Sequence, residues 1–297
     1  MYFLNVFGVL ISMAFFTLLE RKFLGYGHFR SGPNLVGVLG LGQSFSDAFS
    51  LFSSEFLFVF SSNLMFIFFG SFMMLFLSLI LWVLNPYFMG FYSFSLGFMF
   101  FLACVGLGSY LILFCGWGSN SLYSSLGSMR GLSQAISYEI SISFLVLYFL
   151  ISYCSYDFFF VKDFQEFFWG GFLSLFIFFF FFISLLAELS RTPFDFTEGE
   201  SELVSGFNLE YSSYFFAFIF MSEYLNIIFM SFVFFLICLG GFSFIFSIFF
   251  VFFLSFIIII IRGCLPRFRY DFLMVMNWSI FLPVSLIFIF YCVYLSF

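Results

Sequence analysis

The chain has 297 residues, of which 64% are hydrophobic and only 8% are charged. Because soluble domains carry about 25% charged residues, this chain has too few charges to cover a globule of its length with a water-compatible surface. The composition therefore excludes most classes of soluble protein and predicts an all-α polytopic membrane protein.

Several kinds of chemistry find no support in the sequence. The six cysteines are scattered without a C-x-x-C pair, and His28 is the single histidine. The chain also lacks a phosphate-binding GxxxxGK loop and a strand-turn-helix G-x-G-x-x-G motif. We therefore expect no metal, flavin or iron–sulfur cluster in this chain and no nucleic-acid partner. The N-terminus resembles neither a signal peptide nor a transit peptide, so we expect the first hydrophobic segment to be kept.

Eight stretches are long and apolar enough to cross a bilayer, which takes about 20 mostly apolar residues. They cover residues 2–19, 57–84, 94–115, 132–152, 168–187, 213–238, 242–261 and 272–296. Together they predict eight transmembrane helices in a single membrane domain over residues 1–297. Pro283 lies inside the last stretch and predicts a kink there.

Residues 41–52 form a separate, shorter element. Their apolar side chains recur at helical spacing, with polar residues between them, and the segment is too polar to span a bilayer. This pattern predicts a short amphipathic surface helix. Such a helix either lies on the membrane surface or against neighbouring spans, or it lines a cavity, and the sequence favours neither position.

The basic residues predict the orientation of the chain. With eight spans, eight of the nine Lys and Arg residues fall on one side, and Lys162 falls on the other. Loops on the cytoplasmic or matrix side of a membrane collect Lys and Arg. We therefore expect both termini on the outer side, and four loops on the inner side: residues 20–56, 117–131, 188–212 and 262–271.

The acidic residues are not distributed as on a solvated surface. Glu139 and Glu223 lie within predicted spans, where insertion scales assign ionisable groups costs of roughly 2.5–3.5 kcal/mol. Residues 188–210 hold one Arg and six carboxylates, interleaved with Phe, Leu and Val. Since crowded carboxylates can share and pass protons as a cluster, we favour a proton or ion path over a solvated acidic loop.

Residues 266–271, Pro-Arg-Phe-Arg-Tyr-Asp, alternate charged and aromatic side chains. Read as an extended segment, they place Arg267, Arg269 and Asp271 on one side. This side either anchors the chain at the membrane surface or pairs with the acidic loop, which would offset the cost of crowded carboxylates. We predict that the three residues serve structural ion pairing.

In order, and over nearly the whole chain, these residues resemble a family: chain 1 of NADH:ubiquinone oxidoreductase, a mitochondrially encoded membrane subunit of respiratory complex I. The resemblance rests on Glu20-Arg21-Lys22, Gly32-Pro33-Asn34, Ala135 to Glu139, Ala187 to Glu210, and Pro266 to Asp271. It implies a multi-pass protein of the mitochondrial inner membrane, with both termini on the intermembrane-space side.

The resemblance also implies roles for particular residues. The membrane half of a quinone chamber would include Glu20, Arg21, Arg30, Gln43 and Asp47. An acidic path from the chamber to the proton channels of neighbouring subunits would include Glu139, Glu188, Arg191, Asp195, Glu198, Glu200, Glu202 and Glu223. The substrate would be ubiquinone or a related quinone, and no residue of this chain is expected to be catalytic or to hold a redox centre.

The implied partners are the peripheral-arm subunits of the quinone module, neighbouring small membrane subunits and membrane lipid. Ser50, Ser54 and Ser279 stand where family members usually carry Lys, which weakens the expectation of family-type lipid contacts at those positions. Two alternatives stay open. One is the membrane subunit of a related energy-converting hydrogenase, and the other is a proton or ion transporter without redox chemistry, for which internal repeats or broken helices would be expected.

Overall fold

A computed structural model describes residues 2–56, 62–87, 94–166, 169–197, 199, 203 and 205–296 of the chain. The described residues form helices and connecting segments, with no strand among them. Seven helices within these ranges are long and apolar enough to cross a membrane. They are α1 (Tyr2–Gly27), α3 (Leu64–Leu81) with its 3-10 extension η2 (Trp82–Leu84), α4 (Gly97–Gly118), α5 (Leu122–Tyr153), α10 (Ser213–Cys238), α11 (Phe244–Cys264) and the final helix, described below.

The fifth predicted span, residues 168–187, differs from the continuous helix that was expected. Its described part forms α7 (Gly170–Leu173) and α8 (Leu175–Glu188), which are separated at Ser174, where the backbone is extended. With 14 residues, α8 is shorter than the ~20 residues that a span takes. The prediction of one unbroken helix is therefore wrong here, because an apolar run does not reveal an interruption at Ser174.

The final helix is distorted close to the predicted position. It consists of α12 (Tyr270–Met276), a π-helical turn η4 (Asn277–Phe281) and α13 (Leu282–Ser296). Pro283 has no N–H to donate to the preceding turn, and the wider turn lies directly before it. The helix thus continues through the proline with one turn of different geometry.

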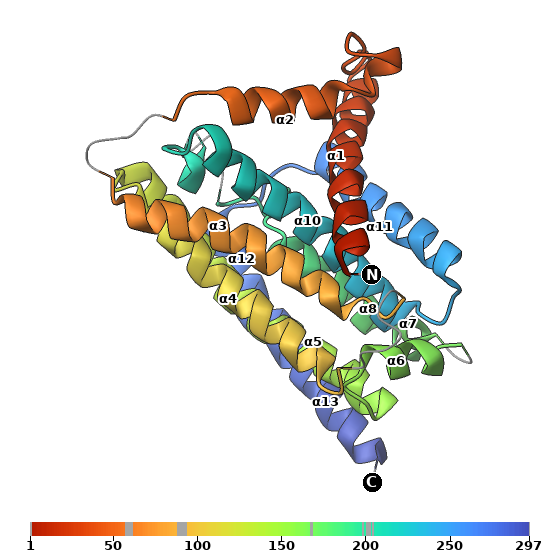
Figure 1. Ribbon diagram of the computed structural model, residues 1–297. Coiled ribbons are helices and arrows are strands. Elements are labelled where there is room, and N and C mark those ends of the chain that lie inside the picture. The colour runs from red at the N-terminus through yellow and green to blue at the C-terminus, as the bar shows by residue number, and fades with distance from the viewer. Residues whose placement is uncertain are drawn as a thin grey trace.

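Two helices lie at the centre of the bundle (Figure 1). Of the long helices, α10 is the most buried, and it packs against α3, α11 and α1. The second, α5, packs against α4, α8 and α13. Buried aromatic side chains fill the space between them, including Phe149, Phe181 and Phe234.

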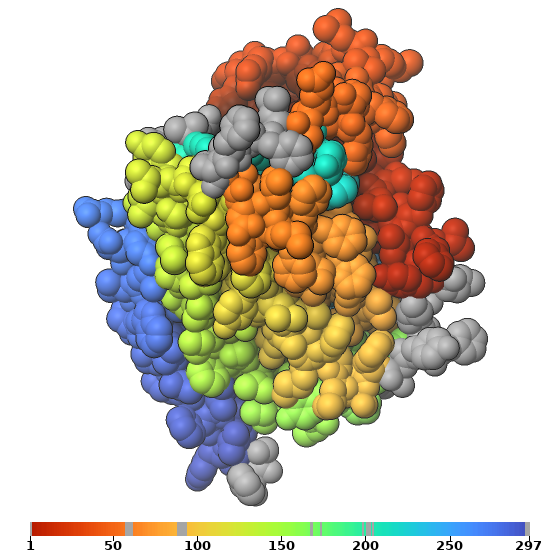
Figure 2. All heavy atoms as spheres, turned by 60° about the vertical axis from the view of Figure 1, so that its left-hand side comes forward, coloured from red at the N-terminus to blue at the C-terminus, as the bar shows by residue number. Residues whose placement is uncertain are grey.

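The outside of the bundle is as apolar as its interior. Large side chains such as Phe72 on α3, Phe179 on α8 and Phe249 on α11 are exposed, whereas serines such as Ser71 and Ser184 are fully buried. Figure 2 shows α3, α4 and part of α5 forming one face, with α1 at one edge and the final helix at the other. Lipid is the solvent that suits this distribution, because it accepts exposed Phe and leaves each polar group to find a partner inside.

The bundle has two distinct ends. The end with Asn5, Trp82 and the short helix α6 (Phe158–Phe164) is called the terminal end here, because both chain termini lie toward it (Figure 1). The opposite end is called the loop end, and it holds the C-terminal turns of α1 and α11. There the predicted amphipathic helix is confirmed as α2 (Gln43–Ser53), which lies crosswise to the bundle and contacts α1 and α10.

Close packing between α4 and α5 gives a first prediction. A Cβ atom at Gly116 would overlap the Ser128 side chain and lie 2.8 Å from the Ser124 carbonyl oxygen. Gly116→Ala should therefore lower the free energy of unfolding by about 1–3 kcal/mol. Gly8→Ala is the control, because a Cβ atom there meets nothing within 4 Å. Equal midpoints of thermal unfolding in detergent for the two variants would contradict this packing.

Candidate functional site

The loop after α8 folds into the loop end of the bundle. Phe194 and Phe207 are buried, and the 3-10 turn η3 (Gly206–Asn208) packs against α5. Gln134 of α5 donates both amide hydrogens to this region, to the carbonyl oxygens of Ala187 at 2.7 Å and Phe194 at 2.9 Å. The described part of this segment is therefore a packed element rather than a solvated acidic loop.

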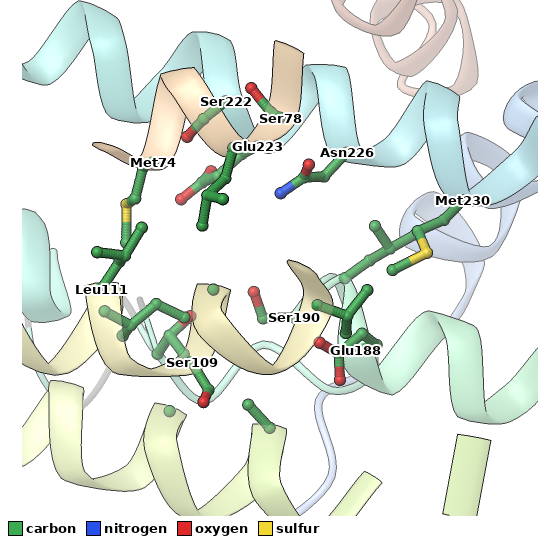
Figure 3. A pocket seen from close by; sticks show the side chains of 18 of the residues that line it. Met74, Ser78, Ser109, Leu111, Glu188, Ser190, Ser222, Glu223, Asn226 and Met230 are labelled. Atoms are coloured by element: carbon green, nitrogen blue, oxygen red, sulfur yellow. The ribbon is translucent and has the colours of Figure 1, made fainter. Parts of the chain in front are cut away.

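A polar cavity of about 110 Å³ lies between this loop and helices α3, α4, α5 and α10. Ser222, Glu223 and Asn226 border it on one side, and Ser109, Ser190 and Glu188 border it on the other (Figure 3). A single water needs only about 10–15 Å³ of this kind of space and two to four polar partners. The cavity is thus large and polar enough to hold several waters between the two carboxylates.

Glu188 and Glu139 form the first pair of acidic side chains at this site. Glu188 ends α8, and its Oε2 atom is buried without a hydrogen-bond partner among the described residues. Glu139 of α5 lies within electrostatic reach of it. The Glu139 carboxyl group rests against the backbone of α4 at Gly106, where any Cβ atom would overlap it. Gly106 therefore leaves the space that Glu139 occupies.

Arg191 and Glu223 form the second charged group at the cavity. The Arg191 Nη2 atom lies 3.4 Å from Glu223 Oε2, and both side chains are largely buried. The guanidinium also stacks on the ring of Tyr224, 4.8 Å from its centroid. Arg191 therefore holds the loop against α10 at the border of the cavity.

Tyr224 extends this group toward α1. Its hydroxyl donates a hydrogen bond to Glu20, and Glu20 also pairs with Arg262 at the end of α11. The Glu20 side chain is only 7% exposed. A buried carboxylate needs such charged and hydrogen-bonding partners. Through these contacts, Glu20, Tyr224 and Arg191 connect the C-terminal part of α1 to the cavity.

The remaining residues predicted for the quinone chamber lie at the periphery of the contacts among Glu20, Tyr224 and Arg191. Arg21 pairs with Asp47 of α2, and Gln43 donates to the same carboxylate at 2.8 Å. Arg30 is exposed. The structure thus brings Glu20, Arg21, Gln43 and Asp47 to one corner of the loop end, where α1 meets α2.

Of the basic residues near α12, one contacts the acidic loop and one does not. Arg267 pairs with Asp195 at 3.0 Å, and the backbone N–H of Phe268 donates to the Pro193 carbonyl oxygen at 3.0 Å. Arg269 instead pairs with Asp271 at 2.9 Å, and both of these side chains are largely exposed. The structure therefore pairs Arg267 with the loop and Arg269 with Asp271 of its own segment.

Glu198, Glu200 and Glu202 lie outside the described residues, so the structure does not place these three members of the predicted path. Conversely, Tyr224 and Arg262 were not predicted for the site, nor were the polar cavity residues Gln134 and Asn226. Gln134 and Asn226 carried a signal, since polar amides inside apolar spans usually face a partner or a cavity.

Within the described part of the chain, His, Cys, Asp and Glu do not gather into a group of three that suits a metal.

The two arginines near α12 allow a matched test. Arg267→Ala leaves the buried Asp195 carboxylate without its cation and should lower the free energy of unfolding by about 3 kcal/mol. Arg269→Ala removes an exposed pair and should change it by less than about 1 kcal/mol. Thermal unfolding midpoints and the rate of proteolysis in residues 189–197 measure both effects. If Arg269→Ala were as destabilising as Arg267→Ala, burial would not decide the strength of these pairs.

Comparison with known proteins identifies the family. The family described as NADH dehydrogenase matches residues 1–293 of the chain. NADH-ubiquinone oxidoreductase chain 1 of Locusta migratoria is 49% identical over 295 residues, which cover 99% of this chain and 94% of that protein. The protein of the same name from Anopheles gambiae is 48% identical, with 98% and 93% covered, and that from Heterololigo bleekeri is 42% identical, with 92% and 89% covered.

These matches cover nearly the full length of this chain and of each relative, so the similarity includes the whole bundle and both of its ends. They decide against the two alternatives, a hydrogenase subunit and a transporter without redox chemistry. The chain is a multi-pass membrane protein that assembles with other subunits of an oxidoreductase complex. It belongs to the family of NADH-ubiquinone oxidoreductase chain 1, a core membrane subunit of respiratory complex I.

Proposed function

We propose that this chain forms the membrane part of the quinone chamber of complex I, together with the beginning of an acidic path that couples quinone reduction to proton translocation. The chamber lies at the corner where α1 meets α2, and the path leads from Glu20 to the cavity between Glu223 and Glu188. The chain carries no redox centre of its own in this proposal, so electrons arrive from a partner subunit.

The single observation that supports this proposal best is the unbroken series of contacts across the loop end. Arg262 pairs with Glu20, Tyr224 donates to Glu20, Arg191 stacks on Tyr224, and Arg191 pairs with Glu223. The polar cavity then separates Glu223 from Glu188. Groups in such a series interact strongly, so a change in charge at one end alters proton binding at the other.

Quinone reduction supplies such a change in charge. The reaction takes up two electrons and two protons, and a negative intermediate near Glu20 would favour protonation of the carboxylates around it. Tyr224 carries an O–H group between Glu20 and Arg191, and waters in the cavity can bridge Glu223 and Glu188. The chain's own residues thereby provide places where a proton can be held and passed on.

Exposed apolar residues at the loop end support a docking site for other subunits. Leu35, Val38 and Leu39 between α1 and α2 are largely exposed, although they lie beyond the end of a spanning helix. Apolar residues exposed to water in this way mark protein contacts. In our proposal, the peripheral-arm subunits of the quinone module cover this surface and complete the chamber for ubiquinone or a related quinone, while small membrane subunits continue the acidic path from Glu139.

The proposal includes a topology. The chain lies in the mitochondrial inner membrane as a single domain with eight spans, in which α7 and α8 together form the fifth. Both termini face the intermembrane space, which places the loop end and its Lys and Arg residues on the matrix side.

Glu188 and Glu210 provide a matched pair for testing the path. Glu188→Gln removes a titratable group from the cavity while keeping its shape, and it should lower coupled quinone reduction and proton pumping by about tenfold or more. Glu210→Gln, in the same segment but away from the cavity lining, should leave both rates nearly unchanged. The measurements are NADH:ubiquinone reductase activity and proton uptake in proteoliposomes, and electron transfer to an artificial acceptor verifies assembly. Full activity and pumping in Glu188→Gln would remove this residue from the mechanism.

The chamber itself is tested by photo-crosslinking. A photoreactive quinone analogue bound to the intact complex should label peptides within residues 20–55 and 188–210, and an excess of ubiquinone should suppress that labelling. Labelling confined to other parts of the chain would place the chamber elsewhere, whatever the result for Glu188.

A further inference from the structure

A second, larger cavity is lined by a separate set of residues from those of the polar cavity. It has a volume of about 410 Å³ and runs between α1, α10 and α11, starting near the terminal end of the bundle. Along α1 its lining extends from Leu4 to Leu19, which corresponds to about 22 Å at ~1.5 Å per residue. One leaflet contributes about half of the ~30 Å hydrocarbon core of a bilayer. The cavity, called the α1–α11 groove here, is thus longer than the ~15 Å of one leaflet and long enough to take an extended lipid tail.

The lining of the groove is mostly apolar, and its serines Ser12, Ser247 and Ser255 donate to carbonyl oxygens of their own helices. Val9, Phe16 and Val251 are typical of its walls, whereas Asn85 and Tyr87 lie at the terminal end together with Trp82. A long apolar tail with a polar group at one end matches this distribution. The occupant should therefore be an amphiphile whose polar part lies toward the terminal end.

Trp82 supplies a hydrogen-bond donor without an acceptor. Its side chain lines the groove and is only 6% exposed, and its indole N–H has no partner among the described residues. A buried donor that stays unpaired costs free energy. The indole ring itself is held by contacts with Phe229 and Phe232, and a ligand oxygen such as an ester carbonyl would supply the acceptor that the N–H lacks.

A basic and an acidic residue lie near the terminal end of the groove. The Lys162 ammonium lies 4.6 Å from the centroid of the Tyr87 ring, and Tyr87 lines the groove. Asp163 follows Lys162 directly and acts electrostatically on the same tyrosine. A cation and a carboxylate therefore both lie close to Tyr87 at this end of the groove.

From these observations we infer that the α1–α11 groove binds a phospholipid with an amine-bearing zwitterionic headgroup, as in phosphatidylethanolamine. One acyl chain lies along the groove, an ester carbonyl accepts the Trp82 N–H, the phosphate meets Lys162, and the ammonium group meets Asp163. This inference does not rest on the proposed quinone chamber: the headgroup lies at the terminal end, whereas the opposite end of the groove, at Leu19, reaches the turn of α1 next to Glu20.

Other occupants match the groove less well. A quinone has no charge to pair with either Lys162 or Asp163, and an anionic headgroup would be repelled by Asp163. A transmembrane helix is ~10 Å wide with its side chains, so a 22 Å length of it occupies on the order of 2,000 Å³, several times the volume of the groove. Each of these alternatives is an outcome of the experiment below.

The experiment uses the intact complex and a phosphatidylethanolamine with a photoreactive group midway along one acyl chain. Labelled peptides should map to residues 4–19 and 244–255, the two walls formed by α1 and α11. Unlabelled phosphatidylethanolamine should suppress this labelling at lower concentration than phosphatidylglycerol. Equal suppression by the two lipids, suppression by ubiquinone, or a groove filled by a helix of a neighbouring subunit would each overturn the assignment.

Two variants and a control test the polar contacts. Trp82→Phe keeps a ring in place but removes the N–H, and Lys162→Gln removes the cation. Each should weaken labelling by about fivefold, the effect of one lost hydrogen bond. Trp278→Phe, in the final helix outside the groove lining, should leave it unchanged. Unaltered labelling in both Trp82→Phe and Lys162→Gln, in complexes that assemble normally, would contradict the proposed headgroup contacts.

Discussion

A charged side chain that is buried in a membrane protein loses its contacts with water and has to find partners inside the protein. This constraint determines the contacts at the loop end of the molecule. Glu20 pairs with Arg262, Glu223 with Arg191, and Asp195 with Arg267. Each pair joins segments that are distant in the sequence. The same few charges that make the site therefore also fix α1, α10, α11 and the loop after α8 relative to one another.

Glu188 departs from this arrangement in an informative way. One of its carboxyl oxygens has no hydrogen-bond partner among the described residues, although the side chain is buried at the border of a polar cavity. Protonation of Glu188 would lower the cost of burying its carboxyl group, and a water in the cavity would supply the missing hydrogen bond. A site that tolerates both forms is suited to gaining and losing a proton, which is the property that the proposed path requires.

The helices were largely predictable because length and composition decide whether a segment can span a bilayer. The α10 helix covers the predicted residues 213–238, and the amphipathic segment 41–52 corresponds to α2 with small shifts at its ends. The break at Ser174 was not predictable from the apolar run alone. The Gly170-Gly171 pair does not mark it either, because both glycines lie within α7.

The site was predictable as a set of residues but not as a set of contacts. Glu20, Glu139, Glu188 and Glu223 stand out in the sequence because ionisable groups are rare in it. Their partners do not, since Arg262 lies 242 positions from Glu20. Helices that are apolar on all sides give no periodic signal of which face points inward. The pairing of Arg262 with Glu20, and the contact of Glu139 with Gly106, depend on the rotation and tilt of each helix.

The contacts of residues 267 and 268 also have a mechanical consequence. Arg267 and Phe268 bind Asp195 and Pro193, and α12 begins two residues later, where the Tyr270 hydroxyl contacts Ser133 of α5 at 2.6 Å. The segment that borders the cavity is thus attached to the base of a lipid-facing helix. A displacement of Asp195 would therefore be transmitted through Arg267 and Phe268 to the first turn of α12.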